Sequence, residues 1–422
     1  MKLTGERLVE TMTDAERSRA ERVEAVLPAL REAAAEADAS AEFPEPHVDL
    51  LREAGLLGLV VPGRFGGLGG GLRDLAAATY AMGTACPSTA LAYFFHNTSA
   101  SRGLLPLEAI DAGLFSEDEE PTVRAFAERV LTRMAHGTWM ANFASEEVKS
   151  SGANIAIATT ARPAEGGWLL DGTKSFGCAT GVADTYLVTA RLEGTDDADG
   201  LALFLVPRTA DGVKSRDPWN GLGMRASANH GITLTGVFVP SDQALTVAGA
   251  FMRMLQVSRG SFVGNQLAIS ATYLGAAQSV YDFAVDRLTR KTFADSGRPI
   301  ASSPMHQVII GEMTERLETA YLWIRRQLDL ETSQPPLRPK PEVYRQWRIA
   351  KGDIAEACFQ VAVDAFKACG TSAATMDGVI GRGLRDLAMG LVMTFPAERG
   401  RLEAAQMITN AKENELFASV RS

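Results

Sequence analysis

The chain has 422 residues, of which 46% are hydrophobic and 22% charged, and its formal net charge is -9. This length and balance indicate a globular protein with sizeable cores and two or three domains, and they exclude a disordered or fibrous chain. The acidic charge argues against nucleic acid as a partner, because phosphate binding uses clustered lysine and arginine.

No membrane partner is expected either. Residues 1–20 lack the apolar segment of a signal peptide, and no uninterrupted apolar run of about 18 residues occurs. We therefore expect a cytoplasmic protein. The four cysteines, which show neither metal-site spacing nor a disulfide framework, are Cys86, Cys178, Cys358 and Cys369. No bound metal is predicted.

The first part of the chain, residues 1–136, predicts a helical domain. Apolar residues recur there at helical spacing in four segments, which are 14–37, 48–57, 72–85 and 88–95. The glycine-rich segment 63–71 lacks the strand, GxGxxG and helix order of a dinucleotide site. It therefore predicts a tight connection between helices.

Residues 137–242 predict a small β-domain, because short alternating runs are separated by turn residues. The expected strands include 167–170, 185–190, 201–206 and 231–239. Asp171-Gly172 predicts a turn after the first of them. The small residues that follow, up to Asp184, allow close approach of the backbone, so we expect a flat ligand at this corner.

Residues 243–422 contain long helical patterns and no strand signals, which favours an antiparallel helical bundle. The predicted helices are 251–288, 305–328, 342–369 and 397–417. The proline-rich segment 335–339 marks one of the connections, since proline cannot continue a helix.

The segment from Asp171 to Asp184, DGTKSFGCATGVAD, resembles the flavin-contacting corner of the acyl-CoA dehydrogenase family. In that family an aromatic residue and a small hydroxyl residue lie along the flavin ring. By resemblance, Phe176 is the aromatic and Cys178 replaces the usual serine or threonine near flavin N5. The resemblance covers nearly the whole chain. It implies an α+β, mostly helical fold with an N-terminal helical domain, a central β-domain and a C-terminal four-helix bundle.

Two further segments resemble flavin-binding elements of the same family. Residues 142–152 are similar to the loop whose hydroxyls reach the flavin and its pyrophosphate, which implies roles for Ser145 and Ser151. Residues 219–227 are similar to the motif that enters the last strand of the β-domain.

The bundle carries residues that the resemblance assigns to FAD of a neighbouring subunit. Arg290 and Phe293 match an Arg-x-x-Phe element that reaches the pyrophosphate and adenine, and arginine can pair two phosphate oxygens. Gln307 matches the adenosine-side glutamine, and Cys369-Gly370 stands where two glycines usually approach the cofactor. The resemblance therefore implies FAD and a homodimer or homotetramer.

A flavin dehydrogenase that acts on an acyl thioester needs a carboxylate to remove the α-proton. In the family this base follows an Arg-Asp pair, and counting from Arg385-Asp386 puts Thr394 at that position. Threonine cannot act as this base. A second family position, just before an arginine on the first bundle helix, is occupied by Ser258 ahead of Arg259.

Three explanations remain open for the missing carboxylate at the family's base positions. Glu398, or less directly Glu403, supplies a displaced base, although Glu398 also suits the first turn of a helix. Alternatively, the protein is similar to the flavin-dependent monooxygenase branch, which needs no α-proton base and in which the flavin is FMN or FAD. A flavin-binding protein without turnover is the third.

The sequence favours oxidation of an acyl thioester bound to CoA or to a carrier protein, ahead of monooxygenation or N-oxygenation of a small metabolite. The first activity needs an electron acceptor and the second a flavin reductase. Two other residues have simpler interpretations: His96 as a core or capping residue and Cys178 as a small packing residue.

Overall fold

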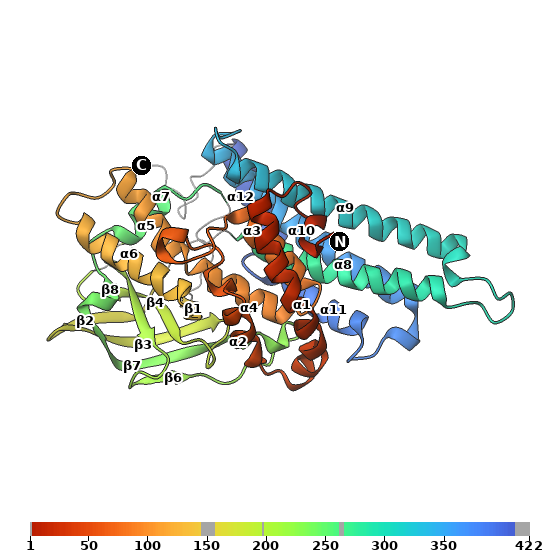
Figure 1. Cartoon of the computed structure of the whole chain (residues 1–422), viewed down its shortest axis with the longest axis horizontal. Helices are drawn as coiled ribbons and strands as arrows, with labels where there is room; N and C mark the ends of the chain where they lie inside the picture. Colours follow the sequence, from red (N-terminus) through yellow and green to blue (C-terminus); the bar gives the residue numbers. More distant parts are fainter. Residues whose placement is uncertain (1, 145–156, 196–197, 261–265, 410–422) are drawn as a thin grey trace.

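The computed structural model describes residues 2–144, 157–195, 198–260 and 266–409. A helical domain, a β-sheet and a helical bundle follow one another along the chain, with the sheet at one end of the molecule and the bundle at the other (Figure 1). This confirms the predicted mostly helical α+β fold. Among the described residues, no helix has the length and hydropathy needed to cross a bilayer.

The N-terminal domain consists of helices that surround a common apolar core. Its α-helices are α1 (Asp14–Ser40), α2 (Pro46–Glu53), α3 (Leu72–Gly83), α4 (Pro87–Thr98), α5 (Ser101–Asp111) and α6 (Glu120–Ala135). α3 and α4 are nearly all buried, because α3 packs on the bundle helix α8 and α4 on both the bundle and the sheet.

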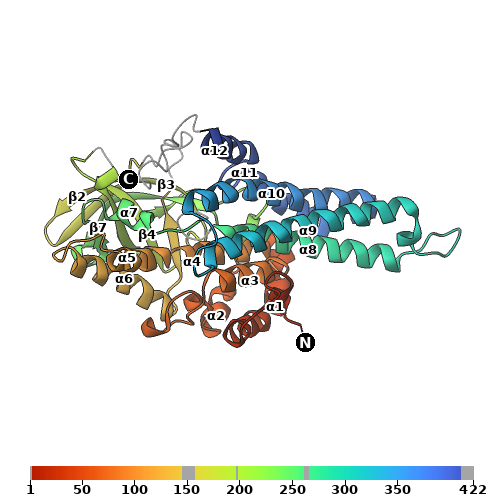
Figure 2. The same ribbon diagram turned by 90° about the horizontal axis from the view of Figure 1, so that it is seen from above.

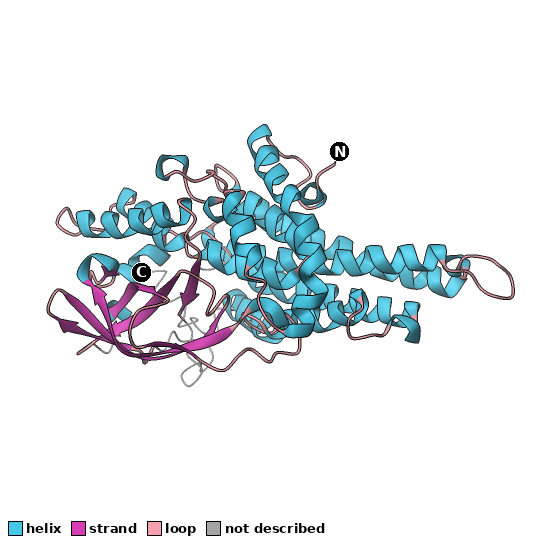
Figure 3. Cartoon of the chain, turned by 60° about the horizontal axis from the view of Figure 1, so that its bottom comes forward, coloured by secondary structure: helices cyan, strands magenta, loops and turns pink. Residues whose placement is uncertain are grey.

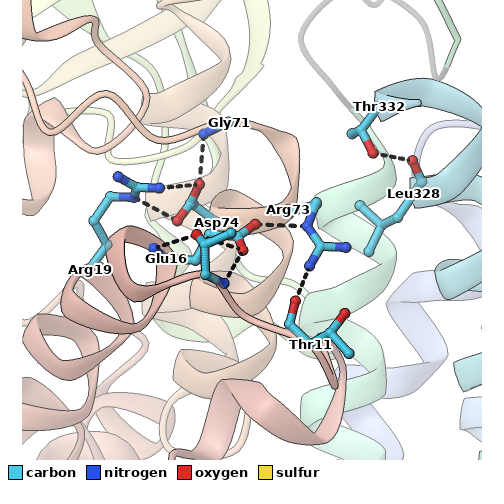
Figure 4. Close-up of polar contacts among 9 residues, drawn as sticks. Thr11, Glu16, Arg19, Gly71, Arg73, Asp74, Leu328 and Thr332 are labelled. Carbon is cyan, nitrogen blue, oxygen red and sulfur yellow. Dashed lines mark hydrogen bonds and ion pairs between the residues drawn. The ribbon is translucent and has the colours of Figure 1, made fainter. Parts of the chain in front are cut away.

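The glycine-rich segment before α3 is closed by side chains of α1 and α3 (Figure 4). Asp74 accepts from the Gly71 N–H at 2.8 Å and from Arg19 Nε at 2.6 Å, and Arg73 Nε donates to Glu16 at 2.7 Å. The N–H groups of residues 68–70 donate to the backbone carbonyls of residues 58, 59 and 61, which precede the segment. These donors are satisfied internally, as expected of a connection between helices.

The β-domain is one sheet with strand order β6-β7-β3-β2-β4-β5-β8, and β1 pairs in parallel with β4. Figure 3 shows the strands as one layer with helices against it. The strands are β1 (Met140–Phe143), β2 (Thr160–Ala164), β3 (Gly167–Gly177), β4 (Thr185–Leu192), β5 (Leu201–Pro207), β6 (Val213–Ser215), β7 (His230–Pro240) and β8 (Ala244–Leu245).

The predicted turn at Asp171-Gly172 is wrong, because β3 continues through it. β3 is held between β2 and β7, and its register with β7 shifts between Leu170 and Gly172. Asp171 Oδ1 accepts from the Gly236 N–H of β7 at 2.7 Å. Pairing on both sides thus overrides the local turn preference, which survives as a bulge.

The bundle consists of α8 (Leu267–Arg290), α9 (Pro304–Thr332), α10 (Lys340–Cys369) and α11 (Val379–Val392). α10 packs on the other three through buried residues such as Trp347, Ile354 and Val361. The predicted helix 251–288 is two helices, α7 (Ala250–Gln256) and α8. Within the predicted helix 397–417, the described part forms α12 (Ala397–Thr409), which packs on α10. The sequence did not predict α11.

Side chains of all three parts meet at one junction beside the β-domain. Arg385 of α11 pairs with Asp38 of α1, and the Asp38 carbonyl accepts from Arg225 Nε at 2.9 Å. Next to it, Asp386 Oδ1 accepts from the Met224 N–H at 2.6 Å. Gly223 leaves no room for a side chain there, because a Cβ atom would lie 2.0 Å from the Arg385 carbonyl oxygen.

The buried junction makes stability depend on pH. Burial raises the pKa of Asp386 from 3.8 to about 7, so the folded protein keeps a proton that the unfolded chain releases. Between these pKa values the unfolded chain binds fewer protons at this group, so the contribution of Asp386 to stability falls as pH rises. Buried histidines such as His96 contribute in the opposite direction, so we expect the Tm of the wild type minus that of the Asp386→Asn variant to fall between about pH 4 and pH 7.

Calorimetry across this pH range measures the effect. Asp377→Asn, at an exposed acid just before α11, is the matched control and should keep the wild-type slope. An Asp386→Asn profile parallel to that of the wild type would contradict the assignment.

Candidate functional site

The corner between β3 and β4 holds a tight backbone arrangement. The Thr180 hydroxyl lies 2.5 Å from the Gly177 carbonyl oxygen and 2.7 Å from that of His230. The N–H groups of Ala179 and Thr180 donate to the carbonyls of residues 227 and 228. The corner is thereby fixed to the segment that leads into β7.

Left-handed backbone conformations gather around this corner. Among the described residues, six that are not glycine have a positive φ. Four of them lie here, which are Phe176, Ala179, Met224 and Ala228. A fifth, Thr394, stands at the family's base position. Such conformations are strained and accumulate at functional sites. Their concentration here therefore supports the corner as a functional site.

A pocket of about 150 Å³ opens beside Phe176. Phe176 is 51% exposed, and its ring meets that of Trp219 edge to face with centroids 6.2 Å apart. Arg216 and His230 also line the pocket. Within the described part of the chain, the buried Trp219 Nε1 and His230 Nδ1 atoms have no hydrogen-bond partner, and burial lowers the pKa of His230. An aromatic wall with unused polar atoms fits a flat heteroaromatic group such as a flavin.

The bundle faces the corner through α8 and α11. Cys178 is 3% exposed, and burial raises the pKa of its thiol, so it remains protonated and packs as a small residue. Tyr273 of α8 is equally buried; its hydroxyl donates to Met393 Sδ at 3.2 Å, and its ring lies against Gly390.

The structure locates the residues considered as a base. Thr394 is exposed on the connection between α11 and α12, and Glu398 is exposed on the first turn of α12. Glu398 lines a cavity of about 290 Å³ together with Lys351, whose pKa burial lowers to about 8. Glu403 is 5% exposed and paired with Arg348 at 2.9 Å, so it is held in a structural ion pair.

The second base position, Ser258, lines a separate cavity of about 140 Å³ between α5, α7 and α9. Arg259 lines it as well, together with two carboxylates, Glu108 and Glu331. This cavity is therefore charged where the family's alternative base would stand.

The bundle residues that were expected to bind FAD lie together at the far end of α8. Arg290 pairs with Asp286 at 2.7 Å, and the Phe293 ring lies 6.4 Å from that of His306, next to Gln307 on α9. At the same end, the Ser372 hydroxyl accepts from Arg287 at 2.6 Å and from Lys291 at 3.4 Å, just after Cys369-Gly370.

This end of the bundle points away from the sheet in Figures 1 and 2. α8 has 24 residues and is about 36 Å long. Within one chain these residues do not meet the corner at Phe176, as expected of residues that serve a neighbouring subunit. Their contact with a cofactor stays a prediction, and Ser145 and Ser151 lie outside the described residues.

Three residues that the structure brings to the site had no site role in the sequence prediction. Trp219 and His230 line the pocket, and Asp386 connects the bundle to the β-domain. The motif 219–227 contained a signal for Trp219, because a tryptophan in a polar loop needs a partner.

His96 is a core residue: its Nε2 lies 2.8 Å from the Leu57 carbonyl, its Nδ1 accepts from Met140, and burial lowers its pKa to about 4.

Three family descriptions match the chain in order. They are acyl-CoA dehydrogenase, N-terminal domain, over residues 13–106, middle domain over 141–237 and C-terminal domain over 267–394. Together with the fold, they define the class, which is that of flavin-dependent oxidoreductases with this three-part architecture. The chain belongs to the acyl-CoA dehydrogenase superfamily.

Individual relatives fall in two groups. L-evernosamine nitrososynthase of Micromonospora sp. is 31% identical over 275 residues, which are 65% of this chain and 62% of that protein. Cyclohex-1-ene-1-carbonyl-CoA dehydrogenase of Geobacter metallireducens is 25% identical over 378 residues, 89% of this chain and 91% of that protein. The chain thus spans about three fifths of the nitrososynthase.

Among solved structures, KijD3 in complex with FMN and dTDP-3-amino-2,3,6-trideoxy-4-keto-3-methyl-D-glucose has a TM-score of 0.81. It is 27% identical, and the alignment covers 100% of both chains. The similarity therefore extends to the whole architecture of a protein that was crystallised with a flavin.

The aromatic pocket predicts the effect of two substitutions. Trp219→Ala and Phe176→Ala should each raise the flavin Kd about tenfold, a loss of about 1.4 kcal/mol, because an aromatic wall against the ring is removed. Fluorescence titration of the apoprotein with flavin measures this affinity. Phe238→Ala, at a 46% exposed aromatic elsewhere on the sheet, should leave it unchanged. Equal affinities in all three variants would place the flavin elsewhere.

Proposed function

We propose that this protein is a flavin-dependent monooxygenase that adds oxygen to the nitrogen of an amine-bearing small molecule. The observation that carries the proposal is the absence of a carboxylate at both family base positions, which are described and hold Thr394 and Ser258. Oxidation of an acyl thioester requires such a base, whereas oxygenation of an amine does not.

The relatives support this proposal. L-evernosamine nitrososynthase acts in name on an amino sugar, and KijD3 was crystallised with FMN and a nucleotide-linked amino sugar. We therefore propose an amino sugar, carried on a nucleotide, as the substrate class.

The residues of the corner have binding and positioning roles in this proposal. Phe176 and Trp219 form the aromatic wall, and Trp219 Nε1 and His230 Nδ1 have hydrogen-bonding capacity for the polar edge of the ring. The protonated Cys178 fills the corner without reacting. The flavin, reduced by a flavin reductase, supplies two electrons, so that amine, O₂ and reduced flavin give hydroxylamine, water and oxidised flavin.

Oxidation of an acyl thioester is the second candidate, and one observation favours it. Glu398 faces the cavity of about 290 Å³ between α10 and α12, so a carboxylate displaced by four residues is present near the family's base position. It would take the α-proton of a CoA-bound or carrier-bound acyl group, and the electrons would pass to an acceptor protein.

One experiment separates the two functions. The flavoprotein is reduced, mixed with ¹⁸O₂ and a dTDP-linked 3-amino sugar, and the products are analysed by mass spectrometry. We expect label on nitrogen and no anaerobic bleaching of the oxidised flavin by a panel of acyl-CoA thioesters. Anaerobic bleaching by a thioester, lost in Glu398→Gln, would instead establish the second candidate and exclude the first.

We propose FAD as the form of the flavin, on the basis of the bundle residues. The basic end of α8 supports FAD, because Arg290 of a neighbouring subunit is expected to reach its pyrophosphate. We expect Arg290→Ala to lower the affinity for FAD about tenfold and to leave the affinity for FMN unchanged. Arg326→Ala, at an exposed arginine of α9, is the control. Equal loss for both flavins, or for neither, would contradict an adenosine-side role.

A further inference from the structure

The pocket beside Phe176 is small, and the formal charges of its lining residues cancel. Its volume of about 150 Å³ is below the roughly 300–1,000 Å³ of sites that enclose a whole drug-sized ligand. The charged residues that line it are Arg216 and Asp217, and both are exposed at the rim. The pocket therefore suits one neutral ring better than a phosphate or an ammonium group.

Trp219 contributes a hydrogen-bond donor to the wall of this pocket. Its indole packs on the backbone of Gly221, where a Cβ atom would lie 2.5 Å from Nε1, and its ring meets that of Phe176 edge to face. An indole N–H can only donate. The Nε1 atom is buried, and none of the described residues supplies an acceptor. A carbonyl oxygen of a ligand would satisfy it.

His230 contributes the complementary acceptor. As the first residue of β7 it pairs with Gly177, directly after Phe176. Its carbonyl oxygen accepts from the Thr180 hydroxyl at 2.7 Å, which fixes its place beside the corner. Burial lowers the pKa of His230, so its imidazole is neutral at pH 7 and one ring nitrogen can accept. Nδ1 is buried, and no donor in the described ranges reaches it.

We propose that this pocket recognises the imide edge of a six-membered ring, in which an N–H lies between two carbonyl groups. Trp219 Nε1 donates to one carbonyl oxygen, and His230 Nδ1 accepts from the N–H. The inference rests on the proposed function and specifies which groups of its ligands the corner binds. Two of those ligands carry such an edge, which are the flavin, on its pyrimidine ring, and the thymine base of a dTDP-linked sugar.

The test removes the N–H from the ligand. The apoprotein is titrated with FMN and with 3-methyl-FMN, and the flavin-loaded protein is titrated by calorimetry with dTDP and with 3-methyl-dTDP. In one of these pairs we expect the wild type to bind the methylated compound at least about tenfold more weakly, because His230 Nδ1 is left buried without a donor. The pair that shows this preference identifies the ring that occupies the pocket.

Substitutions separate the hydrogen bonds from the shape of the pocket. His230→Ala removes the acceptor and leaves room for the methyl group, so it should bind both members of the pair within about threefold. His230→Gln keeps an acceptor and should retain most of the preference. Trp219→Phe keeps an aromatic ring without the donor and should weaken both members about equally. His136→Ala, at an exposed histidine after α6, is the control and should behave as the wild type.

Two results would overturn the imide subsite. The first is a wild type that binds both members of each pair equally, and the second is a preference that persists in His230→Ala. The Tm of every variant is measured alongside. If His230→Ala folds poorly, Trp219→Phe still decides, since wild-type affinities in that variant would also overturn the subsite.

The binding measurements are independent of turnover, so the subsite and the proposed function can fail separately. An imide preference that His230→Ala abolishes, in a protein that forms no oxygenated product, would support the subsite and refute the monooxygenase function. Oxygenated product without any imide preference would refute the subsite alone.

Discussion

The contact between α11 and the β-domain is the constraint on which the rest of the structure depends. Asp386 accepts from the Met224 N–H, and its neighbour Arg385 pairs with Asp38 of the N-terminal domain. Two adjacent residues of one helix thereby fix both other parts of the chain. Met224 also has a left-handed backbone conformation, and its strain is sustained because a buried carboxyl holds its N–H.

This junction determines which groups can face the pocket. With α11 held against the segment 223–228, the β3–β4 corner keeps its own backbone bonds to that segment, and Phe176 remains exposed beside Trp219. On the bundle side, the Tyr273 hydroxyl donates to Met393 at the end of α11. The pocket has an aromatic, polar-edged wall, and the family's base position after α11 holds Thr394, which is not an ionisable base. A cofactor-driven reaction fits such a site better than one that depends on a protein base.

Most of the helices and the position of the β3–β4 corner could be predicted from the sequence, because they depend on local patterns. Helical periodicity located α3, α4, α9 and α10, and the small residues after Asp171 located the corner. α11 was missed because glycines interrupt its apolar pattern. Close packing favours these glycines, because a Cβ atom would lie 2.3 Å from Val280 at Gly383 and 3.3 Å from the Tyr273 ring at Gly390. The link between Met224 and Asp386 spans 162 residues, and only the fold brings such partners together.

The two cavities beside the base positions differ in what they could accept. The cavity at Glu398 combines one exposed carboxylate with Lys351, whose amino group already donates to the carbonyls of Gly390 and Phe395. The cavity at Ser258 instead has a buried carboxylate and a second one at its entrance. The buried carboxylate, Glu331, accepts from Gln327 one turn earlier in α9 and forms part of the cavity wall, so it does not replace the base that is missing at Ser258.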